Sequence, residues 1–331
     1  EEAVRADASI YFFIVSLPMT LKTLNAVFGG VIRATKDTKT PMLINFLANL
    51  LNVGLNLLLI YGVGLGVAGA AAASAISYTL SGIAMIFLAR KRGWLIKPGE
   101  KDFKWDREIM GKAMKIAVPA LGTSVTSCLG YVFFAGMVSG MGTTIFAAHS
   151  IAVTAEELFY IPGYGLRVAT TSLVGNALGE GNYRKQELTE RISIEITVIS
   201  MLLSGILLFL IANPLMELFT IDSEVAVLGA EMLRLIAFTE PLFGLMVVIE
   251  GIFFGAGRTK CVFWIETLSM WGVRILFTWI VIHPLHLGLR EVWYCMIADN
   301  VLKAVLLFGF YLYTRRKEVL KCREDVSGKE L

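Results

Sequence analysis

Charged residues are scarce in this chain. Only 17% of its 331 residues are Asp, Glu, Lys or Arg, whereas an average soluble domain contains about 25%. Hydrophobic residues make up 56% of the sequence, and the mean hydropathy is +0.68. So few polar side chains cannot cover the surface of a water-soluble protein. The composition therefore excludes a soluble domain and indicates a protein that lies in a lipid bilayer.

Residues that bind metals or perform catalysis are also few. The four cysteines lie far apart, at Cys128, Cys261, Cys295 and Cys322, so we expect neither disulfides nor a metal site. The three histidines fall near the predicted outer ends of helices: His149, His283 and His286. No zinc-binding helix motif, nucleophile elbow or phosphate loop is present. We therefore expect no enzyme, no cofactor and no nucleic-acid partner.

Nine apolar runs are long enough to cross a membrane, which takes about 20 residues of α-helix. They lie near residues 8–31, 42–63, 68–89, 115–139, 145–175, 192–213, 227–256, 262–282 and 292–313. Boundaries read from a sequence carry errors of a few residues. The sequence therefore predicts an all-α integral membrane protein with nine transmembrane helices.

Lys and Arg gather in every second connection between these runs. The basic connections are 33–39, 90–115, 184–191, 258–260 and the tail from 315, whereas the intervening connections contain only Arg290. Basic connections are cytoplasmic by the positive-inside rule. The pattern predicts a multi-pass protein of the plasma (inner) membrane with a cytoplasmic C-terminus, and it places Glu1 outside.

A pattern of prolines, apolar runs and basic ends occurs twice. The first copy contains Pro18, Thr38-Lys39 and a basic end at 90–92, and the second contains Pro241, Thr259-Lys260 and a basic end at 315–317. Internal repeats are common in secondary transporters, whose substrate site lies between the repeats. Three further runs precede the second copy only. Completing the first half by symmetry adds three helices before Glu1 and gives a fold of twelve helices in two lobes.

The domain organisation follows from the repeat and from the longest charged connection. We expect residues 1–92 to form the second half of an N-lobe, and residues 93–114 to form a cytoplasmic linker between the lobes. Residues 115–316 then form the C-lobe and residues 317–331 a cytoplasmic tail. Rocking of the two lobes about the linker would open a central cavity alternately to the two sides of the membrane.

Several motifs resemble one transporter family. The first group comprises the segment from Thr35 to Pro41, Asn52 to Gly62, and Gly66 to Ala71. The second group comprises Ala147-Ala148-His149, Ala155-Glu156, Pro162-Gly163, the segments 169–175 and 177–182, Gly255 to Lys260, and Trp271 to Arg274. In order and spacing they resemble the multidrug and toxic compound extrusion (MATE) family. The resemblance implies twelve helices in two lobes and export of organic, often cationic, compounds against protons or sodium ions. This chain would be helices four to twelve.

Four asparagines follow one face of the second run. Asn45, Asn49, Asn52 and Asn56 recur at helical spacing, within roughly 60° of one another. Lipid cannot satisfy four amides, so this face contacts protein or water. The amides either bond to neighbouring helices or order water or a cation. The resemblance favours Asn52 and Asn56 as coupling residues, although several family members carry Asp at the position of Asn56, and Asn does not titrate.

The fifth run carries a carboxylate in the middle of an apolar segment. An ionised carboxylate in hydrocarbon costs several kcal/mol unless it is protonated, paired or exposed to an aqueous cavity. Glu156 shares a helical stripe with Phe159, Tyr160 and Gly163, and we expect Pro162 to break the helix there. An acid beside aromatic rings suits an organic cation. We therefore predict that Glu156, Phe159 and Tyr160 contact the substrate or the coupling cation, and that the role of Glu157 is structural.

The last helices contain further buried charges. Asp299 and Lys303 are neighbours at i and i+4, and we expect Arg274 to join them in a structural ion network. Glu240, directly before Pro241, is predicted near the outer end of its helix. Glu250 lies about 15 Å deeper by helical rise, which makes it the second candidate for a cation-coupled acid.

The favoured hypothesis is a monomeric antiporter in contact with membrane lipid. It exports small organic compounds and uses protons or sodium ions, with no cofactor. One alternative is a flippase for lipid-linked oligosaccharides of the same superfamily, although a phosphate site favours clustered Arg and the basic residues within these runs are scattered. A second alternative is a fragment without function, since half of the first lobe would be missing.

Overall fold

The computed structural model describes residues 2–93 and 106–327, and the side chains of residues 5–93 and 106–317. Within these ranges the chain forms helices and turns and no strand, as the sequence predicts. It divides into two compact units, Glu1–Trp105 and Asp106–Leu331.

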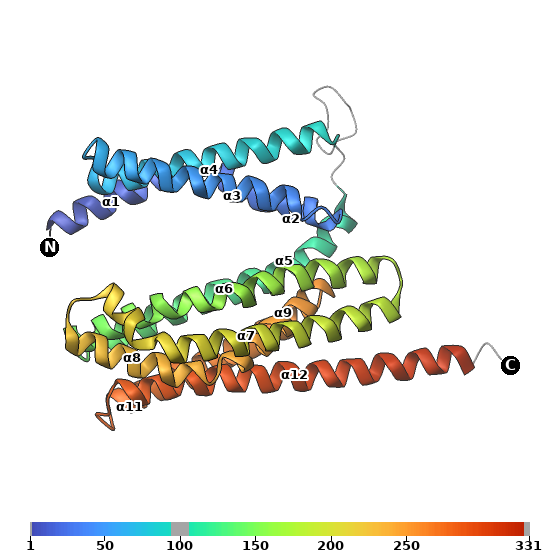
Figure 1. The fold of residues 1–331 in the computed structure, drawn as a ribbon. Helices are drawn as coiled ribbons and strands as arrows, with labels where there is room; N and C mark the ends of the chain where they lie inside the picture. The colour runs from blue at the N-terminus through green and yellow to red at the C-terminus, as the bar shows by residue number, and fades with distance from the viewer. Residues whose placement is uncertain (1, 94–105, 328–331) are drawn as a thin grey trace. The chain divides into compact units, whose positions relative to one another are not determined.

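The first unit contains four α-helices. They are α1 (Glu2–Ser16), α2 (Met19–Ala34), α3 (Lys39–Asn56) and α4 (Gly66–Lys91), and α3 continues into a π-helix, η1 (Leu57–Gly62). Helix α4 packs against each of the other three and lies alongside α3 in Figure 1. Seven of its eight buried residues are Gly, Ala or Ser, with Met85 the exception. Small side chains let membrane helices approach closely, which places α4 at the centre of this unit.

The second unit contains eight α-helices and a π-helix. They are α5 (Arg107–Ser139), α6 (Thr143–Gly179), α7 (Tyr183–Phe219), α8 (Ser223–Ala237), α9 (Glu240–Gly255), α10 (Thr259–Ser269), η2 (Met270–Ile275), α11 (Leu276–Ile282) and α12 (Leu289–Ser327). Helix α6 packs against α7, α8 and α9, and α12 packs against α8, α9, α10 and α11.

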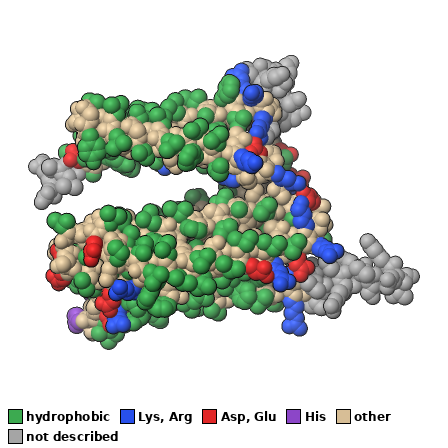
Figure 2. Space-filling view, viewed as in Figure 1, with side chains coloured by type: hydrophobic (Ala, Val, Ile, Leu, Met, Phe, Trp, Pro, Cys, Tyr) green, Lys and Arg blue, Asp and Glu red, His purple; other side chains and the backbone are tan. Residues whose placement is uncertain are grey.

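The described residues contain six helices that are long and apolar enough to cross a membrane, or eight spans if each of two bent pairs is one. The pairs are α1 with α2, bent by 49° at Pro18, and α8 with α9, bent by 58°. The predicted count of nine is not confirmed. The missing run is 145–175, which forms the 37-residue helix α6 but carries Glu156, Glu157 and Arg167. Figure 2 shows apolar side chains over the flanks of the helices, as lipid contact requires.

Three boundaries differ from the predictions. Helix α5 begins at Arg107, inside the predicted linker 93–114, of which residues 94–105 lie outside the described part of the chain. Helix α12 runs to Ser327, well into the predicted tail 317–331. Helix α6 continues through Pro162 from Thr143 to Gly179, so the predicted break at this proline is wrong. Neighbouring helices stabilise the freed backbone groups of a proline in a membrane bundle.

The turn between α2 and α3 is held by an acid. The side chain of Asp37 accepts hydrogen bonds from the hydroxyl of Thr40 and from its backbone N–H, at 3.0 Å for the latter, and it pairs with Arg92 at the end of α4. The bonds from Thr40, and then Arg92, hold the pKa of Asp37 well below its usual range. These contacts join the basic ends of three helices on one side of the first unit.

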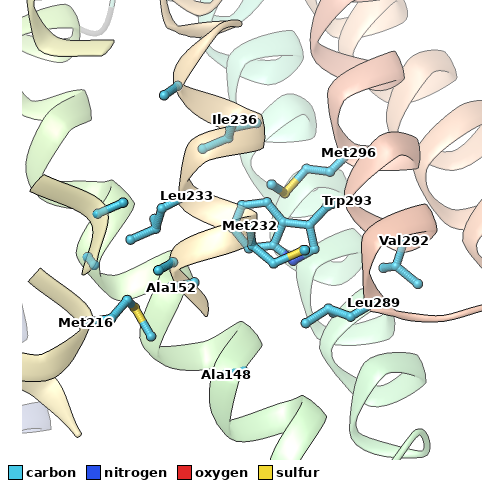
Figure 3. Packing of buried hydrophobic residues seen from close by; sticks show 14 of the residues in the cluster. Ala148, Ala152, Met216, Met232, Leu233, Ile236, Leu289, Val292, Trp293 and Met296 are labelled. Atoms are coloured by element: carbon cyan, nitrogen blue, oxygen red, sulfur yellow. The ribbon is translucent and has the colours of Figure 1, made fainter. Parts of the chain in front are cut away.

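Apolar side chains fill the interior of the second unit in two clusters. The first is centred on Trp293, which is fully buried between Met232 and Met296 in Figure 3. It joins α5, α6, α7, α8 and α12. The second cluster surrounds Phe253 and Ile249 of α9 and includes Leu307 and Tyr311 of α12. Burying an aromatic or aliphatic side chain contributes about 1.5–3 kcal/mol, so these clusters hold α9 and α12 against the long helices.

Helices α6 and α9 approach each other through glycines of α9. A Cβ atom at Gly255 would lie 2.6 Å from the backbone oxygen of Thr171, and one at Gly251 would lie 2.8 Å from that of Arg167. The hydroxyl of Thr171 also donates to the backbone oxygen of Gly251 at 3.1 Å. A side chain at either position would therefore separate the two helices.

We expect Gly255→Ala to destabilise the protein by about 1–3 kcal/mol, because backbone atoms cannot move away as a flexible side chain can. The measurement is the melting temperature of the purified protein in detergent. Gly309→Ala is the matched control, since a Cβ at Gly309 of α12 meets nothing within 4 Å and Ala favours helix. Equal melting temperatures for the two variants would contradict the tight contact.

Candidate functional site

A cavity of about 640 Å³ lies within the second unit. This volume is in the range of pockets that hold drug-sized ligands. Its walls come from α5, α6, α9, η2 and α12. Aromatic and polar side chains line it in equal number. The aromatic ones are Tyr131, Phe134, Phe146, Tyr160, Tyr164 and Phe243, and the polar ones are His149, Ser150, Glu156, Glu157, Arg274 and Asn300.

Glu156 lies at the wall of this cavity and is only 2% exposed. Its carboxylate accepts a hydrogen bond from the hydroxyl of Tyr160, one turn further along α6. The Tyr160 ring stacks on Phe243 of α9, with ring centroids 3.8 Å apart. The aromatic pair fixes the tyrosine, and the tyrosine orients the carboxylate. This carboxylate is therefore held in a fixed position at the wall of a cavity that aromatic side chains line.

Glu240 is a second buried carboxylate near Glu156, although the sequence did not suggest it as a coupling residue. It is the first residue of α9, at the 58° bend after α8, and is 1% exposed. Neither carboxylate oxygen has a hydrogen-bond partner among the described residues. It lies close enough to Glu156 and Tyr160 to interact with both electrostatically. An unsatisfied buried acid is costly, which makes this position a candidate for a functional role. The only signal in the sequence was the Glu-Pro pair inside a long apolar run.

A buried ion network extends behind the cavity. The Nε atom of Arg274 lies 2.8 Å from Oδ2 of Asp299, and the Lys303 Nζ lies 3.1 Å from that oxygen and 3.0 Å from Glu266. Ser269 donates to Asp299 at 2.6 Å. The structure thus brings Arg274, Asp299 and Lys303 together. It also places Arg274 at the cavity wall, which the sequence did not indicate.

Glu250 and Phe159 lie away from the cavity walls. Glu250 forms an ion pair with Arg167 of α6 at 2.9 Å, whereas the sequence suggested it as a second cation-coupled acid. Phe159 packs against the apolar cluster around Trp293, although it follows Glu156 by one helical turn. Glu157, predicted to be structural, borders the cavity and is exposed. Of the predicted stripe on α6, Glu156 and Tyr160 line the cavity, whereas Phe159 does not.

The asparagine stripe of the first unit forms bonds within its own unit. Asn45 accepts from Asn25 of α2 at 3.0 Å, and Asn25 also donates to Ser81 of α4 at 3.1 Å. Asn56 donates to Asn52 at 3.0 Å, and Asn52 approaches Ser74 at 3.5 Å. The amides thus bond to neighbouring helices, as the first alternative predicts, and Asn52 and Asn56 form a half-buried polar pair. The second alternative, that they order water or a cation, stays a prediction.

The charges of the buried ion network balance, whereas Glu156 and Glu240 form no ion pair within the described part of the chain. Arg274, Asp299, Lys303 and Glu266 form a neutral set, and Arg167 neutralises Glu250. No Lys or Arg of the described residues pairs with Glu156 or Glu240. No group of three His, Cys, Asp or Glu in these ranges is arranged to hold a metal ion. The two carboxylates are thus free to receive a proton, a monovalent cation or a cationic ligand.

Comparisons with known proteins show that this chain is similar to transporters. A family model described as MatE matches residues 119–280. A probable multidrug resistance protein NorM of Thermotoga maritima is 26% identical over 99% of this chain and 71% of its own length. The protein DETOXIFICATION 43 of Arabidopsis thaliana is 28% identical over 91% of this chain and 56% of its own. A solved multidrug resistance MATE family transporter in an outward-facing conformation superposes with a TM-score of 0.86 at 26% identity, covering 96% of this chain and 70% of its own.

Proposed function

The chain belongs to the MatE family of multidrug and toxin extrusion transporters, and we propose that it exports organic compounds in exchange for a cation that binds at Glu156 and Glu240. It is a multi-pass membrane protein and a transporter rather than an enzyme. The observation that carries the proposal is a buried carboxylate, Glu156, at the wall of an aromatic cavity, with a second buried carboxylate, Glu240, near it and no ion pair to either among the described residues.

The pair can couple two ligands because both compete for the same negative charge. A proton or sodium ion bound at Glu156 and Glu240 cancels one of their negative charges and weakens the attraction for an organic cation. An organic cation in the cavity likewise disfavours binding of the coupling ion. By linkage, each ligand lowers the affinity of the other by the same factor. Alternating access then exchanges one for the other across the membrane.

The position of Tyr160, beside Glu156 and at the cavity wall, supports the proposed exchange. Its hydroxyl bonds to Glu156, and its ring forms part of the cavity wall. A ligand that displaces the hydroxyl therefore contacts the acid beside the stacked rings of Tyr160 and Phe243, which both line the cavity. This arrangement supports assignment of Glu156 and Tyr160 to the site and of Glu240 as its second acid. Asn52 and Asn56 remain proposed as a polar site in the first unit, and Arg274, Asp299 and Lys303 as a structural network.

The location and topology are part of the proposal. We infer a monomer in the plasma (inner) membrane with its C-terminus in the cytoplasm, because basic residues concentrate at one end of each helix bundle. In the second unit these include Arg184, Lys185 and Arg191 at the start of α7 and Arg315 near the end of α12. Basic ends on one face satisfy the positive-inside rule.

The test is transport by the full-length protein in liposomes. We expect tetraphenylphosphonium, a lipophilic organic cation, to accumulate when a proton or sodium gradient is imposed and not when both gradients are collapsed. Applying each gradient alone identifies the coupling ion. Movement of a fluorescent lipid-linked sugar without movement of the cation would favour the flippase. No movement of either compound would contradict export.

A further inference from the structure

We propose that an acyl chain of a membrane phospholipid binds in a groove between α7 and the bend that joins α8 to α9, and that the bound chain stabilises this bend. The groove is separate from the aromatic cavity of the candidate functional site, because the two share no lining residue. The lipid site itself requires only that the protein lies in a membrane. Its consequence for Glu240 rests on the proposed function.

The groove has a volume of about 190 Å³ and an entirely apolar lining. Its walls come from one face of α7 and from the residues at the bend: Leu202, Gly205, Ile206, Phe209 and Leu210, with Ala237, Phe238 and Pro241. The volume is below the range of about 300–1,000 Å³ that holds drug-sized ligands. The groove therefore suits a single unbranched chain rather than an exported compound.

The groove opens on the outside of the helix bundle. Leu210 is 69% exposed and Phe238 is 75% exposed, and the rings of Phe209 and Phe238 meet edge to face, with their centroids 5.2 Å apart. Gly205 and Ala237, which also line the groove, are buried. The groove is thus continuous with the apolar flanks of the helices, which contact lipid.

The position of the groove along α7 corresponds to the middle of the bilayer. Residues 196–216 of this helix carry no charge, and by helical rise they span about 30 Å, which is the thickness of the hydrocarbon core. Gly205 lies near the middle of this segment. At this depth the surroundings are acyl chains, without water or headgroups. An acyl chain is therefore the occupant whose chemistry matches both the lining and the depth.

The groove adjoins the backbone that positions Glu240. A Cβ atom at Gly205 would lie 2.5 Å from the backbone oxygen of Ala237 and 2.9 Å from the Cβ atom of Glu240, so α7 reaches the bend only because this position has no side chain. Pro241 has no N–H, so the carbonyl of Ala237, four residues earlier, receives no helical hydrogen bond from it. The bend lacks a backbone bond that a straight helix would have, and it depends on packing instead.

An acyl chain in the groove supplies packing on the open side of this bend. Each pair of apolar atoms in contact contributes little, but the contacts add up along a chain that touches both walls. The chain therefore holds α7 against the residues of the bend. Because Glu240 is the first residue of α9, a bend held in this way also holds the Glu240 carboxylate near Glu156.

The direct measurement places a fluorophore at the groove. Phe238→Trp keeps an aromatic side chain there, and Leu203→Trp is the control, because Leu203 is 62% exposed on α7 but lies outside the lining. The purified full-length protein in detergent is titrated with a phosphatidylcholine whose acyl chains carry bromine, which quenches tryptophan fluorescence. After subtraction of the wild-type signal, we expect quenching in Phe238→Trp to saturate as binding to one site does. Quenching in Leu203→Trp should rise without saturation.

Ile206→Trp tests the stabilisation, because a large side chain at this wall fills the groove in place of the lipid. Phosphatidylcholine without bromine should raise the melting temperature of the delipidated wild-type protein in detergent. In Ile206→Trp the rise should be smaller by about 3 °C, the shift that one site gives at about ten times its Kd in a unit of this size. Leu203→Trp should show the wild-type rise.

The outcomes separate this inference from the proposed function. Equal quenching curves for Phe238→Trp and Leu203→Trp would overturn the lipid site, and so would an equal rise in melting temperature for the wild type and Ile206→Trp. Relief of the quenching by tetraphenylphosphonium would assign the groove to an exported compound, and relief that accompanies a doubled mass would assign it to a second copy of the chain. Either result would overturn the acyl chain as occupant. None of these measurements involves transport, so failure of uptake in liposomes would overturn the proposed function and leave the lipid site intact.

Discussion

Glu156→Gln is expected to abolish ion-driven export of organic cations by the full-length protein. The amide oxygen still accepts the hydrogen bond that Tyr160 donates to Glu156, so the local structure should persist. The variant loses the charge for which ion and substrate compete, and with it the coupling between them. We expect gradient-driven uptake of tetraphenylphosphonium into liposomes to fall at least about tenfold, which corresponds to about 1.4 kcal/mol of lost coupling.

Two comparisons make this result specific. Glu217→Gln changes an exposed acid of α7 and should leave uptake unchanged. Glu250→Gln changes a buried acid that pairs with Arg167 outside the cavity lining, so it should lower the melting temperature more than the ion dependence of uptake. Wild-type uptake by Glu156→Gln would remove Glu156 from the mechanism. Loss of coupling in Glu250→Gln with an unchanged melting temperature would restore Glu250 as the second acid in place of Glu240.

Asp299→Asn is expected to cause the largest loss of stability. Asp299 is fully buried and faces both Arg274 and Lys303, so its neutralisation leaves two cations with only Glu266 between them. Removing one partner of a buried ion pair costs about 3–5 kcal/mol. For a unit of this size we expect the melting temperature in detergent to fall by about 10 °C.

Lys112→Met supplies the control for that measurement. Lys112 pairs with Glu108 at 2.7 Å, but both side chains are more than 70% exposed. Such a surface pair contributes at most about 1 kcal/mol, so the melting temperature should change little. A similar melting temperature for Asp299→Asn and Lys112→Met would show that the buried network does not hold the second unit together.

The helical membrane character of the protein could be predicted from the sequence, because each apolar run carries its own signal. Run length, scarcity of charge and the positions of Lys and Arg are local properties, and they indicated helices that the structure contains. The predicted count of nine spans is not confirmed. Helix α6 continues through its proline, yet Glu156, Glu157 and Arg167 reduce its apolar character. The bend between Ala237 and Glu240 divides a run that reads as continuous.

Part of the candidate site could also be predicted. Glu156 and Tyr160 are one turn apart on α6, and helical periodicity alone places neighbours at i and i+4 together. The same rule failed for Phe159 and could not place His149 at the cavity. Periodicity gives the azimuth of a residue on its own helix, whereas the direction of the cavity depends on how α5, α9, η2 and α12 pack around α6.

The sequence by itself determined that the protein lies in a membrane and is helical. It also determined the family motifs and the presence of an acid in an apolar helix. Only the tertiary structure decided which charges meet. The 58° bend after α8 brings Glu240 to Glu156, and Arg167 on α6 takes Glu250. The short π-helix η2 carries Arg274 both to Asp299 and to the cavity. Contacts between helices depend on bends and packing angles, which residues distant in the chain set jointly, so no local pattern records them.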